Sequence, residues 1–191
     1  MSAIVEPHVH RWTRDEYYTM AEAGLFRGNR VELIEGQVVE MSPMGSAHAT
    51  AIVLAGNVLE DAFAHGYVVR WQMPLALSKH SEPEPDIAVV RGNVRDYAQQ
   101  HPDTAVLVVE VSDTSLGYDR TTKAALYAEA GIEEYWIVNL VEHQMEVCRQ
   151  PQPAPEGYGY RYADIVVLSS TERVTPHAAP STSILVADLL P

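Results

Sequence analysis

Thiols, long apolar runs and positive charge are all scarce in this chain. Cys148 is the single cysteine, which excludes an intrachain disulfide and a zinc site built from several thiolates. A lone cysteine is compatible with a reducing compartment, so we expect a cytoplasmic protein. No stretch approaches about 20 consecutive apolar residues, the length of a transmembrane helix. The first residues also lack a basic start and a long apolar run, so we expect no signal peptide and no membrane partner.

The deficit of positive charge bears on possible partners. The chain has 13 Lys and Arg residues against 26 Asp and Glu residues, a formal net charge of -13. Phosphate binding depends largely on Lys and Arg, so this balance counts against a general nucleic-acid binder. It does not exclude a nuclease, because a bound metal ion and a few cations can focus positive potential at one site.

The length of 191 residues, 47% of them hydrophobic, predicts a single domain spanning residues 1–191. Apolar periodicity, capping residues and turn residues predict an α/β fold with a partly parallel central sheet. The expected helices span 14–23, begun by a Thr13–Glu16 capping box, 47–65 and 119–130. The expected strands are a hairpin at 30–41 and segments 67–71, 74–77, 86–90, 105–111, 134–140, 144–149, 165–168 and 184–186, with loops at 79–85, 112–118 and 151–155.

Two carboxylates stand at the ends of apolar strands. Asp86 enters one strand after Pro85, and Glu110 lies near the end of the next. Two acids brought together on neighbouring strands repel unless a cation lies between them, and Mg²⁺ prefers such oxygen ligands. In the alternative interpretation, Asp86 caps a turn and Glu110 pairs with an arginine. The pair alone does not decide between the two.

The helix that follows supplies a candidate cation. Asp119, Lys123 and Tyr127 are spaced i, i+4 and i+8, so they share one helical face. A lysine there could reach back to the carboxylates and orient or help to deprotonate a metal-bound water. The alternative is an ordinary Asp119–Lys123 surface pair.

The ordered set of motifs resembles one family. It comprises 31–36 (VELIEG), 41–43 (MSP), His48, Pro85-Asp86, 109–111 (VEV), Asp119 with Lys123 and Tyr127, 130–131 (AG) and 134–138 (EYWIV). This order is similar to that of the restriction endonuclease family catalogued as domain of unknown function eight-twenty, a branch of the PD-(D/E)XK nuclease superfamily. The resemblance covers about 12–149. It implies a restriction-endonuclease-like core there, a mixed central β-sheet flanked by helices, with an extra N-terminal hairpin and a C-terminal β extension at 150–191.

The resemblance also implies a site. Asp86, Glu110 and the main-chain carbonyl of Val111 would bind Mg²⁺ or Mn²⁺. The lysine that the superfamily usually places two residues after the glutamate is Ser112 here, and Lys123 on the following helix takes its place.

Three further residues have expected roles. Glu32 corresponds to an upstream acid of the superfamily, although alternation with Val31 and Leu33 would also suit a solvated residue. His48 contacts the scissile phosphate or caps its helix. Tyr127 packs in the core with its hydroxyl near the site.

The predicted function is therefore a Mg²⁺-dependent endonuclease that cuts DNA, with Asp86, Glu110, Lys123 and Glu32 as its catalytic residues, acting as a homodimer. The alternative is a catalytically inactive, nuclease-like binding or assembly module. A basic rim around Asp86 would favour the nuclease, and an acidic surround the module. The candidate rim residues are Arg70, Lys79, Arg91, Arg95 and Arg120. A small-molecule enzyme has little support, because no Gly-rich phosphate loop, nucleophile elbow or nicotinamide fingerprint occurs.

Overall fold

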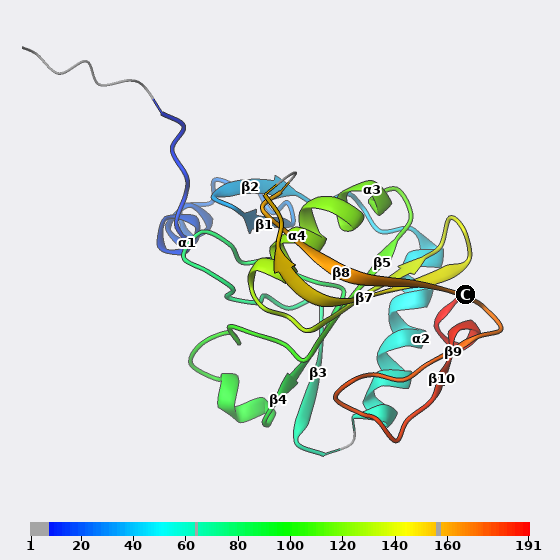
Figure 1. The fold of residues 1–191 in the computed structure, drawn as a ribbon. Helices are drawn as coiled ribbons and strands as arrows, with labels where there is room; N and C mark the ends of the chain where they lie inside the picture. The colour runs from blue at the N-terminus through cyan, green and yellow to red at the C-terminus, as the bar shows by residue number, and fades with distance from the viewer. Residues whose placement is uncertain (1–7, 64, 156–157) are drawn as a thin grey trace, which may run out of the picture.

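The centre of the molecule is a six-stranded mixed sheet. The computed structural model describes residues 8–63, 65–155 and 158–191. The strands follow the order β3-β4-β5-β6-β7-β8, and β5 and β6 form the one parallel pair among the described strands of this sheet. Their bounds are β3 (Tyr67–Trp71), β4 (Ile87–Arg91), β5 (Leu107–Ser112), β6 (Glu134–Asn139), β7 (Gln144–Pro153) and β8 (Tyr160–Ser169). The predicted mixed α/β architecture is confirmed (Figure 1).

A helical crossover joins the parallel pair, as a parallel connection requires. It runs through α3 (Leu116–Tyr118), the π-helical turn η2 (Asp119–Lys123) and α4 (Ala124–Glu129). The predicted helix at 119–130 is thus present but begins three residues earlier. Its middle contains a wider turn, in which the amide of Ala124 bonds to the carbonyl of Asp119. Single π turns inside helices often lie at functional sites.

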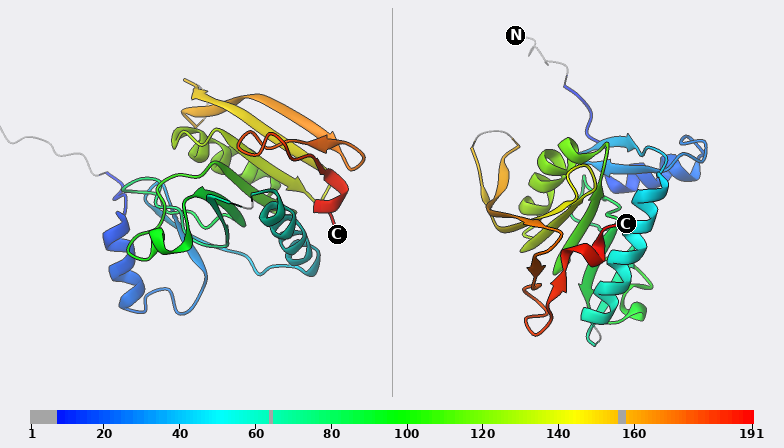
Figure 2. Two further views of the ribbon diagram at one scale, coloured as in Figure 1. Left: turned by 90° about the horizontal axis from the view of Figure 1, so that it is seen from below. Right: turned by 90° about the vertical axis from the view of Figure 1, so that its right-hand side faces the viewer.

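The sheet is covered on both faces. The long helix α2 (Ser46–Ala62) packs on one face with residues such as Leu59 against Val109 and Trp136, while α4 packs on the other with Tyr127 against Val108 and Tyr135. Figure 2 shows the two helices on opposite sides of the sheet. Because both faces are covered, every residue of β5 and β6 is buried, as the unbroken apolar run of β5 indicates.

The N-terminal part forms a separate hairpin with a helix beside it. The hairpin pairs β1 (Val31–Ile34) with β2 (Gln37–Glu40), and α1 (Arg14–Glu22) begins with the predicted Thr13–Glu16 capping box. Both turn residues, Glu35 and Gly36, have positive φ, as a two-residue hairpin turn of this kind requires. The amide of Glu82 donates to the carbonyl of Leu33 at 2.7 Å, which fixes β1 beside the segment that leads into β4.

Two predicted elements were wrong. Residues 74–77 form no strand, although Leu75 is buried; the amides of Leu75 and Ala76 bond to the carbonyls of Pro83 and Pro102 in other segments. The loop expected at 151–155 belongs to β7 as far as Pro153. Beyond Arg149 this strand pairs with β8 and no longer with β6. Prolines are tolerated there because one side of the strand needs no amide donors.

The C-terminal part returns to the α2 face. Its elements are β9 (Arg173–Val174), β10 (Ile184–Leu185) and η3 (Val186–Leu189), and a short helix η1 (Val94–Tyr97) follows β4. Val186 and Leu189 belong to the same apolar cluster as α2. None of the helices in the described ranges has the length and apolar character needed to cross a bilayer. The expected absence of a signal peptide concerns mainly residues 1–7, and the predicted end of the second helix includes residue 64; these residues lie outside the described part.

Candidate active site

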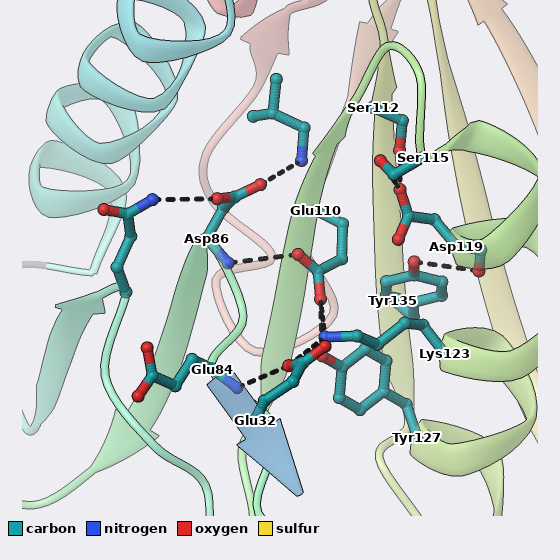
Figure 3. Close-up of polar contacts among 12 residues, drawn as sticks. Glu32, Glu84, Asp86, Glu110, Ser112, Ser115, Asp119, Lys123, Tyr127 and Tyr135 are labelled. Carbon is teal, nitrogen blue, oxygen red and sulfur yellow. Dashed lines mark hydrogen bonds and ion pairs between the residues drawn. The ribbon is translucent and has the colours of Figure 1, made fainter. Parts of the chain in front are cut away.

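The strand register brings Asp86 and Glu110 together. β4 and β5 are antiparallel and pair Ile87 with Val109, so the residue before Ile87 faces the residue after Val109. The Asp86 amide donates to Glu110 Oε2 at 3.2 Å, and the Val111 amide donates to Asp86 Oδ2 at 2.9 Å. Both residues are only 6% exposed. The two carboxylates thus lie side by side at one end of the sheet (Figure 3).

Lys123 reaches this pair from the helix. Its ammonium group lies 2.7 Å from Glu32 Oε2 and 3.3 Å from Glu110 Oε1, and the lysine is 3% exposed. The Tyr127 hydroxyl donates to the same Glu110 oxygen at 2.6 Å. Figure 3 shows these side chains converging from β1, β5 and the crossover helix. The structure therefore contains a buried Glu32–Lys123–Glu110 bridge in place of the alternative Asp119–Lys123 surface pair.

The position of Glu32 differs from a solvated strand residue. It is 3% exposed, because the hairpin lies over the end of the main sheet and turns Glu32 towards Lys123. Its second stabilising contact is the Glu84 amide, which donates to Glu32 Oε2 at 3.1 Å. A buried carboxylate with an ammonium and an amide donor satisfies the requirement that buried charges be paired.

Burial and charge shift the pKa values of this group. Burial raises the pKa of Glu110 to about 8; Lys123 opposes that rise and Asp86 adds to it. For Lys123, burial alone would lower the pKa, but Glu110 and Glu32 together raise it above its ordinary value. Lys123 therefore keeps its proton at neutral pH in this environment, and its neighbours determine that state.

Two residues hold Asp86 from the other side. His48, near the start of α2, has Nε2 3.1 Å from Asp86 Oδ2, and this contact raises the pKa of His48, partly offset by burial. Gln72, just after β3, donates from its side-chain amide to Asp86 Oδ1 at 3.3 Å, and its main-chain amide donates to the Asp86 carbonyl at 3.0 Å. Gln72 has φ of 49°, an uncommon conformation that often marks a functional position.

Ser112 occupies the place of the superfamily's usual lysine and has a different partner. Its hydroxyl donates to Asp119 Oδ2 at 2.6 Å, and Ser115 donates to the same oxygen at 2.6 Å. Burial raises the pKa of Asp119, and the two serine hydroxyls oppose the shift. Tyr135 donates to the Asp119 carbonyl at 3.2 Å. These bonds attach the π turn to β5 and β6. They thereby fix the position of the main chain from which the Lys123 side chain extends.

The site opens into a cavity of about 310 Å³. Among the described residues, the lining has six acidic side chains and two basic ones, with His48 in addition. None of the five candidate rim residues belongs to it. The acidic set is Glu32, Glu40, Asp86, Glu110, Asp113 and Asp119, and the basic pair is Arg30 and Lys123. The basic rim considered from the sequence is therefore not found at this cavity.

The donor set fits a hard divalent cation that keeps part of its water shell. Among the described residues, no group of three or more His, Cys, Asp or Glu side chains is arranged to hold a metal ion by itself. Mg²⁺ often uses only one or two carboxylates with several waters, so Asp86 and Glu110 are sufficient side-chain ligands. Buried acids outnumber buried cations here, and a divalent ion would offset the excess negative charge.

Sequence reasoning missed two participants. Asp119 was considered only for its helical spacing, yet it anchors the π turn through Ser112. Gln72 was not considered, since a lone glutamine at a strand end has no distinctive pattern. Its position could have indicated a role, because Gln72 directly follows β3, and β3 pairs with β4, the strand that Asp86 precedes.

Comparisons with known proteins identify the fold and the family. The chain covers 96% of a crystal structure from Anabaena variabilis ATCC 29413 described as "a putative nuclease belonging to DUF820", and 93% of this chain is aligned at 14% identity with a TM-score of 0.67. At that identity the likeness establishes the fold. No curated protein matches the chain. The model of the Uma2 family, described as "Putative restriction endonuclease", matches residues 14–187, and the chain therefore belongs to that family.

Proposed function

We propose that this protein is a divalent-metal-dependent endonuclease that hydrolyses phosphodiester bonds in DNA. The observation that carries the proposal is the meeting of three side chains at one cavity: Asp86 just before β4, Glu110 in β5 and Lys123 in η2. Membership of the family described as "Putative restriction endonuclease" supports it. Either line alone would be weaker, because one fold can carry many functions.

Asp86, Glu110 and the Val111 carbonyl would hold Mg²⁺ or Mn²⁺. When bound, such an ion supplies Lewis-acid activation of water and stabilises negative charge on the phosphate. Lys123 is held protonated between two carboxylates, so its contribution is electrostatic: it orients the attacking water and balances phosphate charge. It does not act as a general base in this state. Glu32 fixes the ammonium group, and Tyr127 fixes the Glu110 oxygen beside it.

His48 would serve the phosphate contact and not the helix cap, because the N-cap of α2 is Gly45 and no side chain makes a capping bond there. Its ring contacts Asp86 and lines the cavity. The Asp86 contact favours the protonated ring, which would place a second positive charge near a bound phosphate.

A catalytically inactive binding or assembly module is the second candidate. The acidic lining of the cavity favours it, since phosphate binding needs local positive potential. The two candidates differ in a measurable way: the enzyme cuts DNA and needs an ion at Asp86 and Glu110 to do so, while the module does not cut DNA.

The deciding experiment combines cleavage and metal location. Supercoiled plasmid is incubated with wild type, Asp86→Asn and the control Asp61→Asn, an exposed acid on α2, in Mg²⁺ or Mn²⁺. We expect wild type and Asp61→Asn to cut and Asp86→Asn to be inactive while folded. A Mn²⁺ soak should give an anomalous peak between Asp86 and Glu110. Full activity of Asp86→Asn would refute Asp86 as a residue of the cleavage site, while a wild type that cuts no plasmid in either metal would refute the enzyme and leave the module.

Assembly and domain organisation are also proposed. A homodimer suits an enzyme that cuts both strands of a duplex, and a mass of one chain by light scattering would refute it. We further propose that residues 1–191 are one domain, for which urea unfolding should show a single cooperative transition.

A further inference from the structure

Gln72 lies opposite Asp86 at the point where the pairing of β3 with β4 ends. The two strands pair as far as Trp71 and Ile87, so Gln72 and Asp86 occupy the next positions of the same antiparallel register. The main-chain amide of Gln72 donates to the Asp86 carbonyl at 3.0 Å, and its side-chain amide donates separately to Asp86 Oδ1 at 3.3 Å. Because the main-chain bond already joins the two segments, the side-chain bond acts on the orientation of the carboxylate.

The donors around Asp86 distinguish its two oxygens. Each carboxylate oxygen can accept two hydrogen bonds. Oδ2 accepts from the Val111 amide at 2.9 Å and from His48 Nε2 at 3.1 Å, which carries the proton because an ionised carboxylate has none to donate. Oδ1 accepts from Gln72 alone among the described residues. Oδ1 therefore keeps one lone pair that no group in the described part of the chain uses.

Glu110 has the same pattern of used and unused oxygens. Its Oε1 accepts from the Tyr127 hydroxyl at 2.6 Å and from Lys123 at 3.3 Å. Its Oε2 accepts from the Asp86 amide alone, at 3.2 Å, within the described ranges. Each acid of the pair thus leaves one oxygen with an unused lone pair, and both residues line the cavity. Mg²⁺ needs its few carboxylate ligands in near-ideal octahedral directions, so the orientation of each carboxylate matters.

The backbone conformation of Gln72 does not by itself assign a role. Gln150 also has a positive φ, 60° against 49° for Gln72, yet Gln150 is exposed and its side chain makes no hydrogen bond to another described residue. Glycine adopts such a conformation with less strain than glutamine, but it has no side chain to donate. The contact with Asp86 therefore distinguishes Gln72, and Gln150 is its matched control.

We propose that Gln72 is a positioning residue for the cation site. Its side-chain amide holds the Asp86 carboxylate in the orientation in which Oδ1 is offered to a divalent ion while Oδ2 stays bonded to Val111 and His48. This inference rests on the proposed function, because it concerns the ion that the cleavage site would use. Hydrogen-bond partners of metal-ligating groups contribute about 10- to 100-fold to metal affinity.

The test compares Gln72→Met with Gln150→Met, since methionine keeps the length of the side chain and removes the donor. Three quantities are measured: Mn²⁺ affinity by calorimetry, urea stability in EDTA, and the rate of plasmid cleavage as Mn²⁺ is raised. Gln72→Met should lose about 10- to 100-fold in Mn²⁺ affinity at an unchanged urea midpoint. Its cleavage rate should recover when Mn²⁺ is raised by the same factor. Gln150→Met should match wild type in all three.

A second variant, Gln72→Gly, guards against misfolding. Glycine relieves the positive φ and keeps the main-chain bond, so this variant should be at least as stable as wild type and lose the same Mn²⁺ affinity. Wild-type Mn²⁺ affinity in Gln72→Met overturns the inference, as does a loss of affinity accompanied by a lower urea midpoint in both Gln72 variants.

The wild type separates this inference from the proposed function. If wild type binds Mn²⁺ but cuts no DNA, the hydrolytic function fails, while the affinity ratio of wild type and Gln72→Met still decides the role of Gln72. If wild type binds no Mn²⁺, both proposals fail.

Discussion

Replacing Lys123 by methionine tests the buried ion bridge most directly. The lysine is 3% exposed and contacts Glu32 at 2.7 Å and Glu110 at 3.3 Å. Methionine preserves much of the side-chain volume and removes the charge. Breaking a buried ion pair by removing one partner costs about 3–5 kcal/mol, because the other charge remains buried and unpaired. For a chain of this length, that loss lowers the melting temperature by roughly 6–20 °C.

The assay is urea unfolding at pH 8 in EDTA, followed by tryptophan fluorescence; Trp136 is fully buried and reports on the core. The matched control is Lys79→Met. Lys79 is the other lysine of the chain and is exposed, so its replacement should change stability by no more than about 0.5 kcal/mol. The double variant Glu32→Gln with Lys123→Met removes both charges. It should be less destabilised than the sum of the single variants by about 0.5–3 kcal/mol.

A loss below about 1 kcal/mol in Lys123→Met would refute the reasoning, since it would mean that the two carboxylates do not depend on the lysine. Strict additivity in the double variant would refute it as well. Saturating Mn²⁺ should narrow the difference between wild type and Lys123→Met, because a bound cation replaces part of the missing positive charge.

Four further outcomes follow from the structure. Because burial raises the pKa of Glu110 to about 8, Mn²⁺ affinity measured by calorimetry should rise by up to about tenfold per pH unit below 8 and level off above it; a flat profile from pH 6 to 9 would contradict this. In EDTA, the same raised pKa contributes stability below pH 4.5 that is lost as pH rises through about 8. Gly36→Ala should destabilise by at least about 1–2 kcal/mol in urea, since φ is +79° and the new Cβ would lie 2.8 Å from Arg11 Cα. Gly28→Ala is the control, because Gly28 has φ of +80° but no atom within 4 Å of the new Cβ. Its loss of stability therefore measures the backbone strain without the contact with Arg11. Burial raises the pKa of the Cys148 thiol to about 12, so iodoacetamide should label it only after unfolding; rapid labelling of the native protein would show that the thiol is accessible.

Local signals in the sequence were sufficient for much of the fold. Thr13 and Glu16 predicted the start of α1, and Glu35-Gly36 predicted the hairpin turn; both are found. These features depend on residues within a few positions of one another. The strand at 74–77 failed because its apolar residues are buried by segments distant in the sequence, which a local pattern does not reveal.

The part of the site that the sequence predicts is the pair of acidic residues at the ends of apolar strands. Asp86 and Glu110 could be paired by position, and the antiparallel register brings them together. The burial of Glu32 could not be predicted. Alternation along β1 places it on the opposite face of the strand from Val31 and Leu33, but the local pattern does not show which segments cover that face. The π turn could not be predicted either, because its hydrogen bonds span five residues where those of an α-helix span four, and the sequence pattern does not distinguish the two.

The separation of Lys123 from the strand that carries Glu110 has a consequence for descent within the family. A helix can lose a lysine without altering the strands that would hold an ion, so cutting could disappear while ion binding persists. Loss of the lysine alone would destabilise the fold, because the buried carboxylate equivalent to Glu32 would lose its ion-pair partner. A lineage that becomes a binding module should therefore replace the residues equivalent to Glu32 and Lys123 together, whereas the residues equivalent to Asp86 and Glu110 can remain.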